Sequence, residues 1–182
     1  MMRRLVARRD HQAAIAGVLA AGLAFAAATL VRRGLTANGY AWAVVQVALA
    51  GIAAYDIATR RIRNLVTVPG SLLAILLRAA FVREALLEVA LAGVIVFAGF
   101  LVLALVLRGG FGMGDAKLAA MLGFLLGTAV VPALLVGTIT GGVVGALVLA
   151  RSRAMGTTIA YGPYLAFGAA VASLAFSPPD LL

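Results

Sequence analysis

Long apolar runs follow one another along almost the whole chain, each closed by basic residues, glycine or proline. They lie at 13–31, 40–57, 65–81, 86–107, 115–131, 132–150 and 159–176. A helix needs about 20 predominantly apolar residues to cross a bilayer, and these runs are too uniform for the alternating strands of a membrane barrel. The third run is weaker, because Pro69-Gly70 interrupts it and Arg78 lies within it. We expect an all-α, polytopic transmembrane helix bundle with about seven spans.

The first run allows two interpretations. A basic start, an apolar middle and small residues at 24–26 are also typical of a cleaved signal peptide. The run is long for such a peptide and ends directly at Arg32-Arg33, which favours a retained span; cleavage would leave six spans. We divide the chain into a basic cytoplasmic tail (1–12), an extra span and loop (13–39), the main membrane domain (40–176) and a C-terminal tail (177–182).

The basic residues gather on one side of the predicted membrane. If the spans alternate, the N-terminus and the turns after the second, fourth and sixth runs share a side, and 11 of the 15 Lys and Arg residues lie there. The positive-inside rule makes that side cytoplasmic. We therefore read the net charge of +9 as membrane topology rather than nucleic-acid binding. This predicts a multi-pass protein of the plasma membrane, with the lipid bilayer as a partner and no nucleic acid.

Two of the six acidic residues, Asp56 and Asp115, end apolar runs on this basic side. A carboxylate beside a membrane span is costly and indicates a functional site. The other four lie in tails or in a connecting region: Asp10, Glu84, Glu88 and Asp180. The chain has no cysteine, which excludes thiolate metal sites and cysteine catalysis, and the only histidine, His11, has no ligand partner nearby. Asp56 and Asp115 are thus the candidate reactive groups.

Two carboxylates that share a site cannot easily both ionise, so one of them holds a proton near neutral pH. The ionised member can take a proton from water while the protonated member donates to a carbonyl oxygen, as in aspartic peptidases. Gly112 and Gly114, just before Asp115, leave room for a substrate strand. Lys117 points to another helix face, as a snorkelling lysine or as part of the site. A helix cap is the structural alternative for Asp115, but it does not account for Asp56.

Three motifs resemble the type IV prepilin peptidase family, the membrane aspartic peptidases of pilus and related secretion systems. Asp56 with Thr59-Arg60-Arg61-Ile62 and Asn64 is similar to the first-aspartate motif. Gly112-Met113-Gly114-Asp115-Ala116-Lys117-Leu118 is similar to the second, and Tyr161-Gly162-Pro163-Tyr164-Leu165-Ala166 to a late helix start. The resemblance covers about residues 45–175. It implies that Asp56 and Asp115 are catalytic, without metal or other cofactor. It also implies residues that bind substrate or shape the site: Gly112, Gly114, Lys117, Arg60, Arg61, Asn64, Gly162 and Pro163.

The resemblance further implies cleavage, at the cytoplasmic membrane face, of the short basic leader that precedes the hydrophobic helix of prepilins or pseudopilins. Arg63 stands where the family usually has proline, and Asn64 is expected to cap the helix that follows. Without cysteines or an added N-terminal region, the chain is similar to the short, peptidase-only form of tight-adherence pilus systems, and we expect no methyltransferase activity. The oligomeric state is left open.

Three alternatives use the same aspartates. Tyr55-Asp56 and the Gly-x-Gly-Asp pattern ending at Asp115 are shared with presenilin-like intramembrane peptidases, against which the basic turn and the short chain argue. A proton-coupled transporter could use the carboxylates as a relay, but the sequence shows no inverted repeat. A membrane phosphotransferase could hold Mg²⁺ with them, but more acidic residues would be expected.

Overall fold

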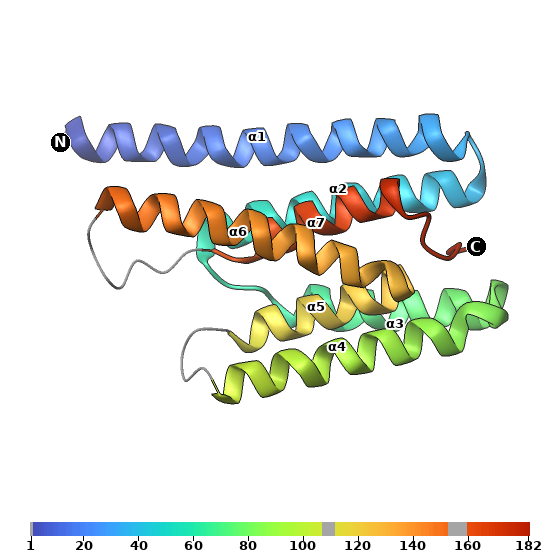
Figure 1. The fold of residues 1–182 in the computed structure, drawn as a ribbon. Helices are drawn as coiled ribbons and strands as arrows, with labels where there is room; N and C mark the ends of the chain where they lie inside the picture. Colours follow the sequence, from blue (N-terminus) through green and yellow to red (C-terminus); the bar gives the residue numbers. More distant parts are fainter. Residues whose placement is uncertain (1, 107–111, 153–159) are drawn as a thin grey trace.

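The computed structural model describes residues 2–106, 112–152 and 160–182, so Phe111, Arg108 and Arg153 lie outside the described residues. These ranges contain only helices, in the order α1 (Met2–Arg33), α2 (Ala37–Thr59), α3 (Asn64–Phe81), the 3-10 helix η1 (Arg83–Ala85), α4 (Leu86–Val106), α5 (Met113–Leu126), the 3-10 helix η2 (Gly127–Ala129), α6 (Val130–Ser152) and α7 (Gly162–Ala175). Successive α-helices run in opposite directions, and the two termini lie at opposite ends of the bundle (Figure 1). The prediction of an all-α bundle is confirmed.

Five stretches of the described residues are long and apolar enough to cross a membrane: His11–Arg33, Ala37–Thr59, Asn64–Phe81, Arg83–Val106 and Met113–Arg151. The last stretch contains two helices, α5 and α6, which the chain joins by a reversal at η2 (Figure 1). The remaining helix, α7, is apolar but shorter. The protein is therefore a multi-pass membrane protein, with a number of helices close to the expected number of spans.

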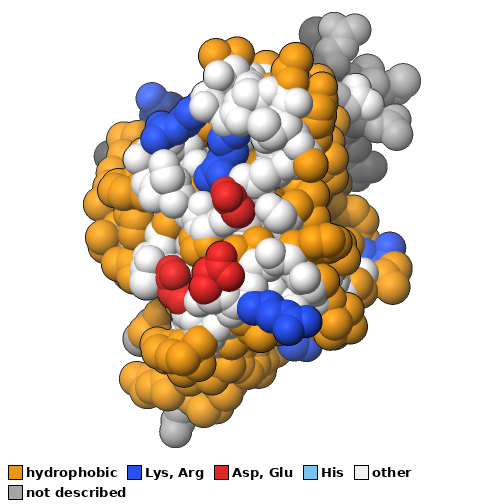
Figure 2. All heavy atoms as spheres, turned by 90° about the vertical axis from the view of Figure 1, so that its right-hand side faces the viewer, with side chains coloured by type: hydrophobic (Ala, Val, Ile, Leu, Met, Phe, Trp, Pro, Cys, Tyr) orange, Lys and Arg blue, Asp and Glu red, His pale blue; other side chains and the backbone are white. Residues whose placement is uncertain are grey.

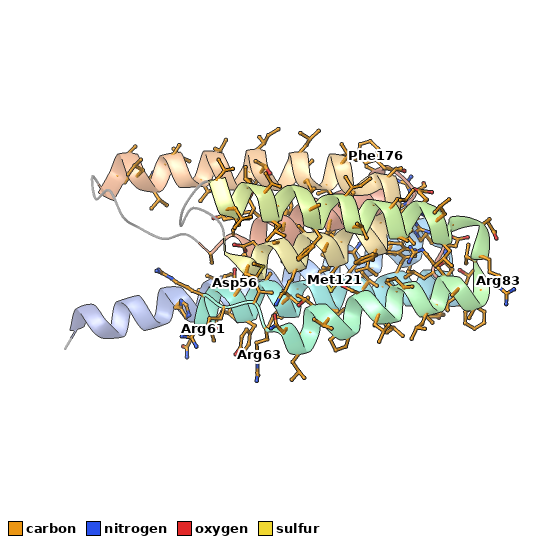
Figure 3. The ribbon with its side chains drawn as sticks, turned by 90° about the horizontal axis from the view of Figure 1, so that it is seen from below. Asp56, Arg61, Arg63, Arg83, Met121 and Phe176 are labelled. Carbon is orange, nitrogen blue, oxygen red and sulfur yellow. The ribbon has the colours of Figure 1, made fainter. Side chains whose placement is uncertain are left out.

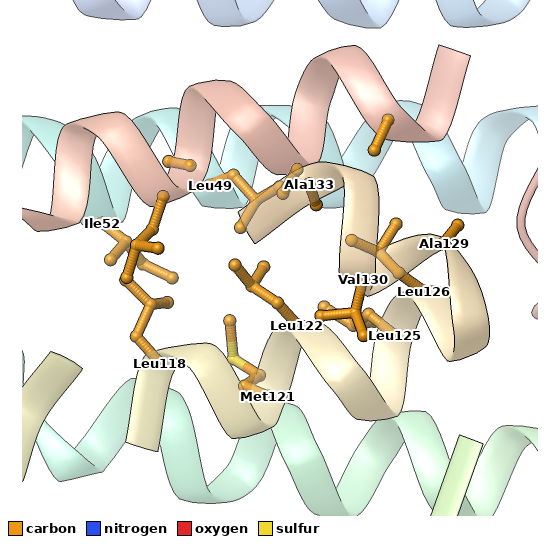
Figure 4. Packing of buried hydrophobic residues seen from close by; sticks show 14 of the residues in the cluster. Leu49, Ile52, Leu118, Met121, Leu122, Leu125, Leu126, Ala129, Val130 and Ala133 are labelled. Carbon is orange, nitrogen blue, oxygen red and sulfur yellow. The ribbon is translucent and has the colours of Figure 1, made fainter. Parts of the chain in front are cut away.

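The two shortest α-helices, α5 and α7, form the centre of the bundle. Leu118 and Leu122 of α5 and Leu165 of α7 are almost fully buried in one hydrophobic cluster, to which α2 and the start of α6 contribute Leu49, Ile52 and Ala133 (Figure 4). Each central helix has 14 residues, or about 21 Å at 1.5 Å per residue, which is less than the ~30 Å of a bilayer's hydrocarbon. At one end of the molecule α1 and α6 continue beyond the first turns of α5 and α7 (Figure 1).

The reversal between α5 and α6 comes earlier than the sequence indicated. We expected it between residues 131 and 132, because proline at 132 suggested a break. The structure instead ends α5 at Leu126, where Gly127 adopts a left-handed φ of 58° and its N–H bonds to the carbonyl of Gly123. Pro132 lies in the first turn of α6, where its missing N–H has no intrahelical partner to lose. Pro69, which interrupts the third apolar run in the sequence, lies inside a continuous α3.

Small residues allow the helices to approach closely. A Cβ atom built on Gly123 of α5 would lie 2.7 Å from the Cα of Gly93 in α4, and one built on Gly137 of α6 would lie 2.8 Å from the carbonyl oxygen of Tyr164 in α7. Helix α1 packs against α2 in the same way, through Gly22. Polar contacts add to this packing, since Gln46 of α2 donates to Thr29 of α1 over 3.4 Å and to Ser173 of α7 over 2.5 Å.

Candidate active site

Asp56 lies in the last turn of α2 and is 4% exposed. The helix ends just beyond it because Arg60 takes a left-handed conformation, with φ 52° and ψ 38°, and its N–H bonds to the carbonyl of Asp56 over 2.7 Å. The carboxylate Oδ2 of Asp56 accepts a hydrogen bond of 3.0 Å from the backbone N–H of Gly162, the first residue of α7. Such first N–H groups have no intrahelical partner and carry the positive end of the helix dipole. The N-terminus of α7, the positive end of its dipole, therefore points at the carboxylate of Asp56.

Glycine is required at position 162 by the closeness of this contact. A Cβ atom built on Gly162 would lie 2.6 Å from Asp56 Oδ2 and 3.1 Å from its Cγ. Pro163 occupies the next position of α7, where a helix tolerates proline because the missing N–H would be unpaired. The Gly162-Pro163 pair therefore starts α7 while leaving room for the carboxylate of Asp56.

Asp115 is the third residue of α5 and is half-buried. Its Oδ2 accepts a hydrogen bond of 3.2 Å from the backbone N–H of Gly112, and its own N–H donates to the carbonyl of Gly112 over 3.0 Å. Asp115 therefore caps α5 from inside the first turn, a variant of the cap considered from the sequence. Each of the two aspartates thus accepts a backbone N–H at the start of a central helix.

The structure brings Asp56 and Asp115 together at one end of the bundle. They belong to helices α2 and α5, and each carboxylate accepts a backbone N–H at this end, Asp56 from Gly162 and Asp115 from Gly112. Two like charges that interact oppose each other's ionisation. Figure 3 shows Asp56 pointing into the bundle at this end. The arrangement offers two coupled carboxylates, which can hold one proton between them.

The turn between α2 and α3 packs against the start of α5. Ile62 is the contact, since a Cβ atom built on Gly114 would lie 3.1 Å from the Cβ of Ile62. Arg60 and Arg61 are exposed and lie on the outside of this turn. The sequence singled out Gly114 and both arginines but not Ile62, whose only signal was its place in the first-aspartate motif.

Asn64 and Lys117 lie in the same region, and Asn64 does not make the cap expected of it. Asn64 does not cap α3, whose N-cap position is held by Arg63 without a side-chain hydrogen bond. Its Oδ1 instead accepts a hydrogen bond of 3.0 Å from Lys117 Nζ. This bond ties α5 to the start of α3.

Tyr161 is a further residue that the sequence did not single out beyond its motif. It lies just before Gly162 and its hydroxyl bonds to Thr138 Oγ1 of α6 over 2.9 Å. The contact joins the start of α7 to α6. It thereby helps to position the backbone N–H of Gly162, which donates to Asp56 Oδ2.

Among the described residues, no group of three or more His, Cys, Asp or Glu side chains is placed to hold a metal ion. The expectation that the chemistry requires no metal stays a prediction, and a chelator tests it.

Comparison with known proteins adds one finding. The model of the type IV leader peptidase family matches residues 43–150, a range that includes Asp56, Asp115 and the turn between α2 and α3. Helix α1 and the Gly162-Pro163 start of α7 lie outside the matched range. No curated protein and no solved structure matches the chain.

Proposed function

We propose that this chain, which belongs to the type IV leader peptidase family, is an aspartic endopeptidase that removes the short basic leader of prepilins or pseudopilins. Membership of the family makes it a leader-peptidase-like protease in general terms. The observation that supports the finer proposal is that Asp56 and Asp115, from α2 and α5, each accept a backbone N–H at the start of one of the two central helices, at the same end of the bundle. No other pair of acids within the described residues stands at such a position.

The proposed mechanism uses one shared proton. The ionised aspartate removes a proton from water, and the resulting hydroxide attacks the carbonyl carbon of the scissile bond. The protonated aspartate donates its proton to the carbonyl oxygen, and a proton is returned to the leaving amine when the C–N bond breaks. The N–H groups of Gly162 and Gly112 hold Oδ2 of Asp56 and of Asp115, and in this mechanism Oδ1 of each carboxylate acts on water or substrate.

The surroundings support a substrate that enters from the membrane surface. Arg60, Arg61, Arg63 and Lys117 share the end of the bundle at which the pair lies, in accord with a cytoplasmic site in the plasma membrane. A prepilin presents its scissile bond beside a hydrophobic helix, and the pair lies at the end of a bundle of apolar helices. We assign the peptidase to the domain 40–176, with 13–39 as an additional span, and expect no methyltransferase activity.

A reconstitution experiment tests the proposal. The purified protein is incubated in lipid nanodiscs with candidate prepilins from its own genome, and new N-termini are mapped by mass spectrometry. We expect one cut between the basic leader and the hydrophobic segment, unchanged by EDTA and without ATP. Loss of cleavage in EDTA that Mg²⁺ or Zn²⁺ restores would exclude the aspartic mechanism, and proton flux without any cleavage would favour a transporter.

A further inference from the structure

A groove opens on the outside of the bundle between α2 and the first turns of α3. It has a volume of about 330 Å³. Its wall is apolar and includes Gly51, Ile52 and Val66, and its rim at the aspartate end includes Tyr55, Arg61 and Arg63. The groove therefore has an apolar wall along the membrane spans and two arginines at the end of the spans that carries Asp56.

The two guanidinium groups at the rim are free to bind an anion. Arg61 and Arg63 are both exposed, and the only ion pair within the described part of the chain joins Arg33 to Asp180. Arg63 is held against the wall, because its Cζ atom lies 5.8 Å from the centre of the Tyr55 ring. Figure 3 shows Arg61 and Arg63 projecting outward at the end that holds Asp56, whereas Arg83 lies at the opposite end.

The backbone does not require arginine at position 63. Its angles, φ −81° and ψ 131°, are extended and suit proline, and its side chain makes no capping bond to α3. The side chain of Arg63 therefore acts at the groove rather than in the turn.

We propose that this groove binds an anionic phospholipid, with the phosphate on Arg61 and Arg63 and an acyl chain along Ile52 and Val66. Guanidinium groups bind phosphate oxygens in pairs, and basic pockets between transmembrane helices are suited to anionic head groups. The groove is lined by residues of two candidate membrane spans, α2 and α3, so a phospholipid of the surrounding bilayer can reach it. The inference goes beyond the proposed peptidase activity and does not depend on it.

The position of the groove connects the lipid to the catalytic end. Ile62 lines the groove and also contacts Gly114, next to Asp115. A lipid that fills the groove braces the turn between α2 and α3 against the start of α5.

The test measures lipid binding in the inactive Asp56→Asn protein, so that its result is independent of cleavage. The protein is purified in nanodiscs of phosphatidylcholine and phosphatidylglycerol, and the lipids that remain bound are counted by native mass spectrometry. We expect at least a threefold preference for phosphatidylglycerol. Arg61→Gln combined with Arg63→Pro removes both cations, with proline suited to the backbone angles at 63, and should reduce the preference to that of a random lipid.

A second variant fills the groove without changing charge. A Cβ atom built on Gly51 meets no atom within 4 Å, so Gly51→Leu should fold and should displace the bound lipid. Gly99→Leu, at an equally open position of α4, and Arg83→Gln, at the opposite end, should change nothing. An unchanged preference for phosphatidylglycerol in both groove variants would overturn the proposal. It would also be overturned if these variants lost binding of a prepilin while retaining the lipid.

Discussion

The buried charged side chains at the two ends of the bundle differ in the number of hydrogen-bond partners described for them. At the end far from the aspartate pair, Arg78 is fully buried, and its guanidinium donates to the carbonyls of Leu125 over 2.5 Å, Pro179 over 3.3 Å and Ala74 over 3.4 Å. At the other end, Asp56 is also buried, yet the side-chain bond described for it is a single one, from Gly162. Within the described residues, Arg78 thus has three carbonyl partners, although its Nε has none, and the Asp56 carboxylate has one N–H partner.

Other hydrogen bonds also join the segments at the end that contains Arg78, which we call the closed end. The end that contains Asp56 and Asp115 is called the open end. Glu88 Oε1 accepts from both the N–H and the hydroxyl of Thr128 over 2.8 Å, which fixes η2. Asp180 pairs with Arg33 over 3.2 Å and accepts from Asn38. The C-terminal segment thereby returns onto the bundle and buries Leu181. Figure 2 shows acidic and basic side chains close together at the centre of this face, with hydrophobic side chains around them.

The comparison separates structural charges from reactive ones. A charge with several hydrogen-bond partners is fixed in one protonation state and stabilises the fold. A pair of like charges with few partners is easily protonated and deprotonated, which is what acid–base chemistry needs. Variants at the two ends should therefore differ in kind: those at the closed end should change stability, and those at the open end should change activity.

The largest effect is expected at the open end. Asp56→Asn and Asp115→Asn should each reduce leader cleavage by about 10³-fold or more, because an amide cannot take the proton from water. Insertion and thermal unfolding should stay near normal. The double variant should be no worse than either single one, since the two residues act as a unit. Cleavage is measured by gel shift in a strain without other prepilin peptidases.

Glu88→Gln is the matched control at the closed end. The glutamine carbonyl can still accept both bonds from Thr128, so cleavage and stability should hardly change. Substantial cleavage by either aspartate variant would remove that residue from the pair.

The second effect is at the closed end. Arg78→Met should lower the free energy of unfolding by about 3 kcal/mol, because the carbonyls of Leu125 and Pro179 lose their donor. The folded fraction should still cleave at its normal rate. Chemical unfolding in detergent measures the change. Arg83→Met, which removes an exposed bond to the carbonyl of Ala79, should cost no more than about 0.5 kcal/mol; equal losses in both variants would contradict the closed-end assignment.

The third effect returns to the open end. Gly162→Ala places a methyl group 2.6 Å from Asp56 Oδ2, so it should move the carboxylate and reduce kcat/KM by about 10- to 100-fold with little loss of stability. Gly142→Ala is the control, since a Cβ atom there meets no neighbour within 4 Å. It should be slightly stabilising, as alanine favours a helix. Normal cleavage by Gly162→Ala would show that the amide contact is not needed.

The smallest effect is at the rim of the closed end. Asp180→Asn removes the ion pair with Arg33, in which the aspartate side chain is 59% exposed. We expect a loss of about 0.5 kcal/mol that disappears at high salt. A loss as large as that of Arg78→Met would mean that the ion pair, and not the buried arginine, closes this end.

The sequence indicated candidate residues at the open end and none at the closed one, and the catalytic role of Asp56 and Asp115 stays a prediction. Asp56 and Asp115 stand out because acids are rare and charge counting puts both on one side, which required no knowledge of contacts. Arg78 gave no such signal: in the sequence it only weakened an apolar run, and its partners are backbone carbonyls from distant segments. The reversal at Gly127 was misplaced for a related reason, since its left-handed φ cannot be read from composition, whereas Pro132 suggested a break that the first turn of a helix tolerates.

The shortness of α5 has a consequence for the position of Asp115. Helices α5 and α6 meet at η2 in the closed end, so the difference between 14 and 23 residues falls entirely at the open end. At 1.5 Å per residue this is about 13 Å. A bilayer adjusts its thickness to the apolar length of the protein it surrounds, and here that length differs between the centre and the outer helices. The start of α5, which carries Asp115, therefore lies about 13 Å short of the end of α6 along the bundle.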